Sequence, residues 1–430
     1  MRFAFATFGS LGDLHPVLAL ACEAKGRGHA AVVAAATHHR KSVEAAGLEF
    51  RPLRPEIEMA PELLEYLFDL SRGPERLLRE VIFANVRESY EDLCAVGEGA
   101  DVLVVGECLY GAPMAAEKLG IQWANLILAP TSFLSASDPT VLPQMQFLHR
   151  LRWVWFHRLA NAIGRLQTGW WARPHYRLRR SLGLAAGANP VFDAKHSPHL
   201  TLAMFPEFFA SRQPDWPASS EVCGFPFYEQ PRALPENLAR FLENGPPPVV
   251  FTLGSIVAHF EPEFYHVAAR VASELGRRAV LLTGNNARIP QNLPDSILAL
   301  DYAPLAQILP RAAAIVHAGG IGTCAESLRA GIPSVVIPFS FDQPDNAHRL
   351  QRLGVAEVAN RFQIPRLATP LRKILDNPSP AQRARSLAAQ IDPRAAASNG
   401  VNALENLLSS LQEPALRGFR RRAGVRGEFD

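Results

Sequence analysis

The sequence predicts an α/β protein made of two doubly wound, Rossmann-like parallel-sheet domains that face a central cleft. Three observations support this fold class. The chain has 430 residues, more than one hydrophobic core usually organises. Short apolar runs alternate with helix-like stretches in both halves, which is typical of parallel sheets covered on both faces. A passage rich in proline and glycine separates the two halves.

The first half begins with a predicted strand, a glycine loop and a helix. The apolar run Phe3 to Phe8 predicts the strand, residues 9–13 form the loop, and a helical pattern continues to Gly26. Further strands are expected at the next apolar runs, residues 31–35, 102–105 and 124–128. Together these elements predict an N-terminal domain over residues 1–225.

A linker and a second domain are expected after this point. Prolines such as Pro231 and Pro248 cannot continue a helix or a central strand, so residues 226–248 are predicted to be the linker. The strand pattern then restarts, at residues 249–253, 279–282, 297–300, 313–316 and 334–337. We expect a second α/β domain over 249–415 and a basic, mobile tail over 416–430.

Composition and charge exclude several classes of protein. With 48% hydrophobic and 20% charged residues, the chain has the composition of a globular protein. Its net charge of +3 is too small to indicate a nucleic-acid partner. The five scattered cysteines lack metal-ligand spacing and are typical of a reduced, cytoplasmic chain. No signal peptide or membrane-spanning run is expected, so we predict a cytoplasmic protein.

A glycine-rich segment predicts a phosphate-binding site. His317-Ala318-Gly319-Gly320-Ile321-Gly322-Thr323 follows a predicted strand and precedes a helical pattern. Glycines at a helix N-terminus let backbone N–H groups approach an anion, and the helix dipole favours negative charge there. The spacing matches neither the dinucleotide-binding pattern nor the P-loop. By itself the segment is either a phosphate cradle or a glycine turn without a ligand.

The surrounding motifs carry a resemblance to a known family. Tyr302-Ala303-Pro304-Leu305, the cradle, and Asp342-Gln343-Pro344-Asp345-Asn346-Ala347 resemble the donor-binding signature of the GT-B nucleotide-sugar glycosyltransferases, family 1. Gly9-Ser10-Leu11-Gly12-Asp13-Leu14-His15-Pro16 is similar to the N-terminal loop of its bacterial members. The same motifs, with Phe205-Pro206, Asp215-Trp216-Pro217 and Gly224-Phe225-Pro226, are similar more narrowly to the rhamnosyltransferase of rhamnolipid synthesis. The resemblance covers nearly all 430 residues.

The resemblance implies a donor site in the second domain for a UDP-sugar or a dTDP-sugar, with no other cofactor. The sugar hydroxyls would bind Asp342 and Gln343, and the nucleotide base would lie against Tyr302 and Ala303. The family often has a second histidine where this protein has Ala318. The diphosphate would be held by residues that offer N–H or O–H donors: Ser255, His317, Gly319, Gly320, Gly322 and Thr323. Gly12 of the N-terminal loop is also expected in the donor site.

Glu326 bears on which nucleotide is bound. The resemblance implies that a Glu five residues before Gly331 accepts from both ribose hydroxyls, which favours UDP. The rhamnosyltransferase resemblance implies a deoxythymidine nucleotide, which lacks the 2′-hydroxyl, so the two inferences conflict. Alternatively, Glu326 lies on the first turn of the helix and only complements its dipole.

The resemblance places the acceptor in the N-terminal domain, with a general base in the loop after the first strand. Asp13 stands at that position and would need burial or a neighbouring carboxylate to raise its pKa. His15 is the alternative base, or else packs against the following helix. Glu107, after the strand at 102–105, would orient His15, assist Asp13, or simply be solvated.

Residues 147–180 form a stretch of aromatic and basic side chains. No acidic residue lies between Asp138 and Asp193, whereas four of the six tryptophans do. Three interpretations remain open: peripheral contact with the inner membrane, the lining of an apolar acceptor pocket, or a helical hairpin packed on the N-terminal domain. Stacking on nucleic acid is less favoured, because no other basic region is as long.

The resemblance implies an inverting hexosyltransferase with Asp13 as base, and we expect it to be metal-independent. No acidic pair of the kind that holds a metal follows a predicted strand. The expected acceptor is a hydroxyl on a hydrophobic, lipid-like molecule such as a 3-hydroxy fatty acid derivative. The alternatives are a sugar-nucleotide epimerase of the same architecture, glycosylation of a polyketide or phenolic natural product, and a binding module without catalysis.

Overall fold

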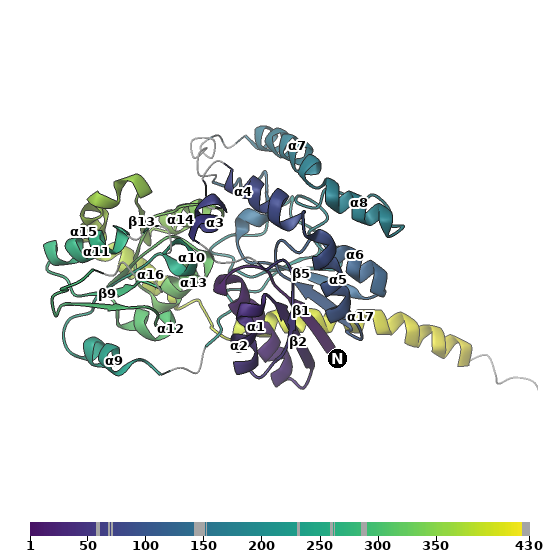
Figure 1. The fold of residues 1–430 in the computed structure, drawn as a ribbon. Helices are drawn as coiled ribbons and strands as arrows, with labels where there is room; N and C mark the ends of the chain where they lie inside the picture. Colours follow the sequence, from purple (N-terminus) through teal and green to yellow (C-terminus); the bar gives the residue numbers. More distant parts are fainter. Residues whose placement is uncertain are drawn as a thin grey trace, which may run out of the picture.

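The computed structural model consists of two parallel sheets with helices on their faces (Figure 1). It describes residues 1–56, 61–67, 69, 72–141, 151, 153–229, 233–258, 261, 263–284 and 290–423. Among these residues, no helix is long and apolar enough to cross a membrane. The two-domain α/β architecture predicted from the sequence is confirmed.

The N-terminal sheet has the strand order β3-β2-β1-β4-β5-β6-β7, with every neighbouring pair parallel. Its order reverses between β1 and β4, where ligands bind in open α/β sheets. The strands are β1 (Arg2–Ala6), β2 (Ala30–Ala35), β3 (Glu49–Pro52), β4 (Val102–Val105), β5 (Gln122–Ile127), β6 (Leu200–Ala203) and β7 (Ser220–Val222). Phe3 and Phe5 face the core on one side of this sheet, and Ala4 and Ala6 face the core on the other.

Helices cover both faces of this sheet and extend beyond it. The sheet-associated helices and short elements are α1 (Leu11–Gly26), α2 (Arg40–Ala45), α5 (Val86–Gly97) and α6 (Ala112–Leu119), with one-turn helices at Thr37–His39 and Pro130–Phe133. The more peripheral ones are α3 (Pro61–Leu67), α4 (Gly73–Arg76), the π-helical turn Leu77–Ile82, α7 (Val154–Trp171) and α8 (Arg173–Ser181).

The C-terminal sheet repeats this plan with the order β10-β9-β8-β11-β12-β13, again parallel throughout. Its strands are β8 (Val249–Thr252), β9 (Ala279–Leu282), β10 (Ile297–Leu300), β11 (Ala314–His317), β12 (Ser334–Val336) and β13 (Ala356–Val358). Its helices are α10 (Gly254–Val257), α11 (Glu263–Glu274), α12 (Leu305–Ile308), α13 (Ile321–Ala330), α14 (Gln343–Arg352), α15 (Ala368–Asp376) and α16 (Pro378–Ala388), with short turns at Leu309–Arg311 and Arg361–Arg366.

Apolar side chains from both domains meet in one buried cluster. Phe205, Phe209 and Trp216 of the N-terminal domain pack there with Leu328 and Leu350 of the C-terminal domain. The two domains are therefore joined by a shared apolar core as well as by the connecting segment.

The segment predicted to be the linker contains a helix. α9 (Glu236–Glu243) begins after Pro235, buries Leu238 and Leu242, and packs beside β8 and β9. The prolines exclude a continuous helix over 226–248, but they leave eight residues free to form one, and Pro235 has an extended conformation suited to the residue before a helix.

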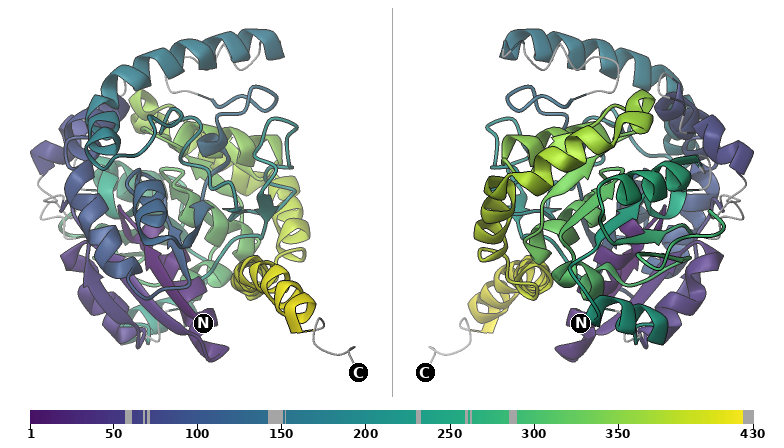
Figure 2. Two further views of the ribbon diagram at one scale, coloured as in Figure 1. Left: turned by 90° about the vertical axis from the view of Figure 1, so that its right-hand side faces the viewer. Right: turned by 90° about the vertical axis from the view of Figure 1, so that its left-hand side faces the viewer.

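The last helix, α17 (Ala395–Ala423), returns to the N-terminal domain (Figure 2). Val401, Leu404 and Leu408 lie in the same core cluster as Phe3 and Phe5. Arg27 donates to the Ser398 hydroxyl at 2.6 Å, and His29 lies 2.7 Å from Glu405. The C-terminal part of the expected domain 249–415 therefore packs on the other domain, and the helix runs into the segment 416–430 that we expected to be a mobile tail.

Candidate functional site

The glycine segment forms the tight connection between β11 and α13. Gly319 has a φ of +93°, and a β-carbon there would lie 2.9 Å from Val336 Cγ1 and 3.1 Å from the Gln343 carbonyl oxygen, so only glycine fits. At Gly320 and Gly322, an added β-carbon would meet nothing within 4 Å. The space beside these two glycines is therefore open, and the first-turn N–H groups of α13 lie at the positive end of the helix, which suits an anion.

His317 lies at the end of β11, beneath this cradle. It is 1% exposed, and its Nδ1 accepts from the Gly319 amide at 3.1 Å. Burial lowers the pKa of His317 to about 3, so the ring is neutral and carries its proton on Nε2. Nε2 has no hydrogen-bond partner among the described residues, which makes it a donor available to a bound ligand.

Asp342 and Gln343 follow β12, where α14 begins. Asn346 donates to Asp342 Oδ2 at 2.6 Å and to the Gly319 carbonyl at 3.0 Å, so it links Asp342 to the glycine cradle. Gln343 Oε1 accepts from the amides of Phe339 at 2.9 Å and Ser340 at 3.2 Å. The side-chain oxygen of Gln343 is therefore already hydrogen-bonded to the loop that precedes α14. The side-chain NH₂ group of Gln343 is the part that can bind a sugar hydroxyl.

Glu326 lies on α13, but not on its first turn. Because α13 begins at Ile321, Glu326 is its sixth residue, so the alternative that it complements the helix dipole is wrong. Its Oε2 lies 2.8 Å from Arg329, which also pairs with Glu229 at 3.2 Å. Burial raises the pKa of Glu326 while Arg329 opposes that rise. One of its two carboxylate oxygens is therefore already engaged within the protein.

The residues expected against the base lie between β10 and α12. Tyr302 is 40% exposed, whereas Ala303 is buried. An exposed aromatic ring at the carboxyl end of a strand can stack on a nucleotide base. The side chain of Ser255 lies outside the described residues, although its backbone belongs to α10.

Asp13 occupies the first turn of α1. Its Oδ2 accepts from the Ser10 amide at 2.8 Å and from the Ser10 hydroxyl at 3.2 Å. Burial raises the pKa of Asp13 to about 6, the charge of Glu107 adds to the rise, and the Ser10 bonds oppose it. The Gly12 amide donates to Ser10 Oγ at 3.1 Å, so it serves the helix cap instead of the donor site.

His15 lies one half-turn further along α1, against the Tyr228 ring at a centroid distance of 5.6 Å. Burial lowers the pKa of His15 to about 4, and His39 adds to this effect. His39 itself lies 3.0 Å from the Gly9 carbonyl oxygen. His15 is therefore neutral at pH 7 and could accept a proton, but it is a weaker base than Asp13.

Glu107 directly follows β4 and is held in the protein rather than solvated. Its Oε2 accepts from the Ser132 hydroxyl at 2.5 Å and its Oε1 from the Leu128 amide at 3.3 Å. Burial raises the pKa of Glu107, while Lys195 and these hydrogen bonds lower it. The alternative that Glu107 is a solvated loop residue is wrong.

The carboxyl groups of Asp13, Glu107 and Asp342, which come from both domains, lie close enough for their charges to interact. Burial raises the pKa of Asp342 to about 7, Asn346 opposes the rise, and the charges of Asp13 and Glu107 increase it. Among the described residues, these groups form no cluster that could hold a metal ion. The structure thus brings Asp13, Glu107 and Asp342 close enough to interact, as their positions after the carboxyl ends of β1, β4 and β12 allow.

Sequence reasoning missed several residues of this region. Arg349 is 2% exposed and joins Asp345, at 2.8 Å on its own helix, to Asp138 of the other domain, also at 2.8 Å. Asp345 also accepts from the Val141 amide at 3.1 Å. Asp138 and Arg349 are far apart in sequence and match no local motif, so no signal in one sequence could pair them.

Cavities are also found on the N-terminal side, among the described residues. An open cavity of about 630 Å³ is lined by Arg54, Glu56, Leu63, Glu80 and Glu88, among others. A small cavity of about 20 Å³ lies behind Glu107 and is lined by Cys108, Tyr110, Asn125 and Lys195, among others. Apart from Glu107, the residues lining them were not among the predicted site residues.

Comparisons with known proteins agree with this geometry. The family described as "Erythromycin biosynthesis protein CIII-like, C-terminal domain" matches residues 270–407, which contain the glycine cradle and Asp342. O-mycaminosyltylonolide 6-deoxyallosyltransferase of Streptomyces fradiae is 31% identical over 407 residues, covering 90% of this chain and 93% of that protein. Similarity therefore extends through both domains.

Solved structures share the whole architecture. CalG4, the calicheamicin glycosyltransferase, is 18% identical with a TM-score of 0.71, covering 95% of this chain and 98% of its own. The glycosyltransferase VinC, solved in complex with DTDP, is 23% identical with a TM-score of 0.67, covering 95% of this chain and 100% of its own. These matches confirm the predicted GT-B fold. The narrower resemblance to the rhamnosyltransferase of rhamnolipid synthesis stays a prediction.

Proposed function

Since the chain belongs to family 1 of the GT-B glycosyltransferases, we propose that it moves a 6-deoxyhexose from a thymidine-diphosphate sugar to a hydroxyl group of a hydrophobic acceptor. The observation that carries this proposal is the arrangement of two carboxylates: Asp13 is held by Ser10 on the first turn of α1, and Asp342 is linked through Asn346 to the anion cradle of α13. One domain thus offers a base and the other a site for the leaving group.

For the donor, we favour the deoxythymidine nucleotide over UDP. VinC was solved with DTDP, and the Streptomyces fradiae relative is named for a 6-deoxyhexosyl group. Glu326 supports the same choice, because its Oε2 is engaged by Arg329 and is less available for a 2′-hydroxyl. In this proposal the diphosphate lies against the amides of Gly319 to Thr323 and the Nε2–H of His317, and Tyr302 stacks on the base.

In the proposed reaction, the acceptor oxygen attacks the anomeric carbon as its proton passes to the Asp13 carboxylate. The bond between that carbon and the diphosphate oxygen breaks, and the oxygen keeps the electron pair. The first-turn amides of α13 and His317 stabilise the charge that develops on the leaving group. A single displacement of this kind inverts the configuration at the anomeric carbon. No step requires a metal ion, since the helix terminus supplies the positive potential.

Within this mechanism, Glu107 has a positioning role. It is fixed by Ser132 and Leu128, and its charge raises the pKa of Asp13 toward the value that a general base needs near neutral pH. Asp342 and the NH₂ group of Gln343 would bind the sugar hydroxyls. His15 remains the alternative base.

For the acceptor, we favour a polyketide-type natural product. The Streptomyces fradiae relative, which this chain matches over 93% of that protein's length, is named for transfer to O-mycaminosyltylonolide. CalG4 is named for calicheamicin. The 3-hydroxy fatty acid derivative stays as the second acceptor. The similar proteins reported above are glycosyltransferases, which favours transfer over epimerisation and over a binding module without catalysis. The expected membrane contact of 147–180, of which residues 151 and 153–180 are described, also stays a proposal.

The test is a transfer assay with the full-length protein, dTDP- and UDP-6-deoxyhexoses, and a panel of macrolide aglycones and 3-hydroxyacyl acceptors. We expect a product heavier by one deoxyhexose, of inverted anomeric configuration and unaffected by EDTA. Asp13→Asn should abolish transfer and keep nucleotide binding. Release of free sugar isomers without any acceptor, or full activity of Asp13→Asn, would contradict the proposal.

A further inference from the structure

Helix α7 (Val154–Trp171) carries a strip of large, exposed apolar side chains. Trp155, Leu159, Ile163, Leu166 and Trp170 are spaced by four, four, three and four residues, so they share one face of the helix. Their exposed fractions lie between 48% and 79%. We call these five residues the outer strip.

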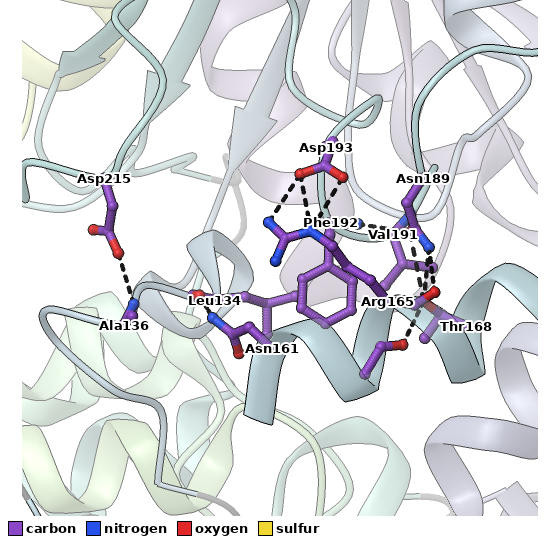
Figure 3. Close-up of polar contacts among 11 residues, drawn as sticks. Leu134, Ala136, Asn161, Arg165, Thr168, Asn189, Val191, Phe192, Asp193 and Asp215 are labelled. Atoms are coloured by element: carbon purple, nitrogen blue, oxygen red, sulfur yellow. Dashed lines mark hydrogen bonds and ion pairs between the residues drawn. The ribbon is translucent and has the colours of Figure 1, made fainter. Parts of the chain in front are cut away.

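The opposite face of α7 is polar and binds the protein (Figure 3). Asn161 donates to the Leu134 carbonyl at 2.6 Å, and Arg165 pairs with Asp193 at 3.0 Å. Asn189 donates to the Thr168 hydroxyl at 3.1 Å. A helix that only covered a domain would turn its apolar face inward. In α7 the polar face is turned toward the domain and the apolar face is exposed. The exposed apolar face is therefore available for a second contact.

The outer strip is not part of the site described above. α7 runs along the outside of the molecule in both views of Figure 2. No α7 residue lines either of the two cavities described. Of the four tryptophans in this region, Trp171 packs on the N-terminal domain, whereas Trp153, Trp155 and Trp170 are about half exposed or more. The interpretation as a packed hairpin is therefore wrong for most of its tryptophan rings.

The charge around the strip indicates what covers it. No Asp or Glu occurs in residues 139–192. The exposed arginines Arg158, Arg173, Arg177 and Arg180 lie on α7 and on the adjoining helix α8, and none of them forms an ion pair with a described residue. Tryptophans stand near both ends of the strip, and the rings of Trp153 and Trp155 stack at 6.0 Å.

We propose that the outer strip of α7 docks on an anionic lipid surface, with the helix parallel to the membrane plane. Apolar side chains on one face, tryptophans at its ends and arginines beside it are the composition of an interfacial helix. A second copy of this protein fits less well, because a symmetric α7–α7 contact brings two sets of arginines together without acidic partners. The inference does not depend on the proposed donor or acceptor.

The test is co-sedimentation of the full-length protein with phosphatidylcholine vesicles, with or without phosphatidylglycerol. We expect binding only to the anionic vesicles, accompanied by a blue shift of tryptophan emission and lost at high salt. The triple variant Leu159→Gln, Ile163→Gln, Leu166→Gln should bind at least about tenfold more weakly. Phe362→Gln is the matched control, because Phe362 is also exposed, at 73%, but lies on the other domain.

Charge and self-association are tested separately. Arg173→Gln with Arg177→Gln should weaken binding to anionic vesicles and leave circular dichroism and nucleotide binding unchanged. Equal binding of the triple variant and the wild type, or no binding to anionic vesicles, would overturn the proposal. So would a wild-type dimer in solution that the triple variant converts to monomers, because the strip would then be covered by a second copy.

Discussion

The carboxylate of Asp13 fills the space that a side chain on residue 9 would occupy. Gly9 has a φ of +125°, and a β-carbon there would lie 2.8 Å from Asp13 Cγ and still closer to Oδ2. Two features therefore require glycine at residue 9: its backbone conformation, and the proposed base Asp13 that lies beside it.

Gly9→Ala should therefore move Asp13. We expect kcat to fall by roughly ten- to a hundredfold, because small displacements of a reacting group have effects of that size. The free energy of unfolding should fall by about 1–3 kcal/mol from backbone strain. Steady-state kinetics and urea unfolding check both. Gly26→Ala, where an added β-carbon meets nothing within 4 Å, is the control within the helix that follows.

The pH dependence of transfer distinguishes the two candidate bases. The base acts only when deprotonated, and the pKa of Asp13 is about 6, so kcat/KM should rise with pH through about 6 and then level off. If His15, with a pKa of about 4, were the base, activity would persist undiminished to about pH 5. Profiles of Asp13→Asn and His15→Gln show which substitution removes the titration.

Ionised Asp342 should lower the free energy of unfolding at neutral and higher pH. Its folded-state pKa of about 7 lies above the ordinary value of 3.8, so between these values the folded protein holds a proton that the unfolded one does not. The contribution of Asp342 to stability therefore rises as pH falls from 8 to 5. Asp342→Asn should raise the unfolding free energy at pH 8 by roughly 1–3 kcal/mol and reduce this slope, as measured by urea titration at several pH values. An unchanged slope would contradict the raised pKa.

Glu326→Ala tests the nucleotide. Since Arg329 engages one carboxylate oxygen, we expect dTDP to bind at least as tightly as UDP and its affinity to change little in the variant. Isothermal titration of both nucleotides measures this. If UDP binds more tightly and loses roughly three- to tenfold in affinity in the variant, Glu326 binds the ribose and the donor is a UDP-sugar.

Arg349→Leu should be strongly destabilising. It would leave Asp345, which is 1% exposed, without its buried partner, at a cost of about 3–5 kcal/mol. Arg352→Leu is the matched control on the same helix, because Arg352 lies 3.8 Å from Asp138 and its side chain is 48% exposed. Its effect should stay within about 0.5 kcal/mol. Urea unfolding of both variants gives the comparison.

Strands that are apolar and buried on both faces could be predicted from the sequence, as β1, β4, β8 and β11 show. β3, β6, β7 and β13 were not predicted. β3, β7 and β13 each include charged or proline positions, and the short run of β6 contains a threonine. The glycine cradle was predictable because a positive φ and a helix N-terminus have a local signature. The Asp138–Arg349 pair had no such signature, since it depends on how two domains meet.

Because α17, at the end of the chain, packs on the N-terminal domain, the two domains cannot be exchanged between relatives as two continuous segments of sequence. A hybrid enzyme that takes its C-terminal half, the proposed donor half, from a relative and joins it at residues 226–248 would also import a foreign α17. The foreign helix would have to replace Val401 and Leu404 against Phe3 and Phe5, and Ser398 and Glu405 against Arg27 and His29. Recombination that exchanges the C-terminal halves therefore needs a second crossover before Ala395, so that each N-terminal half keeps its own helix.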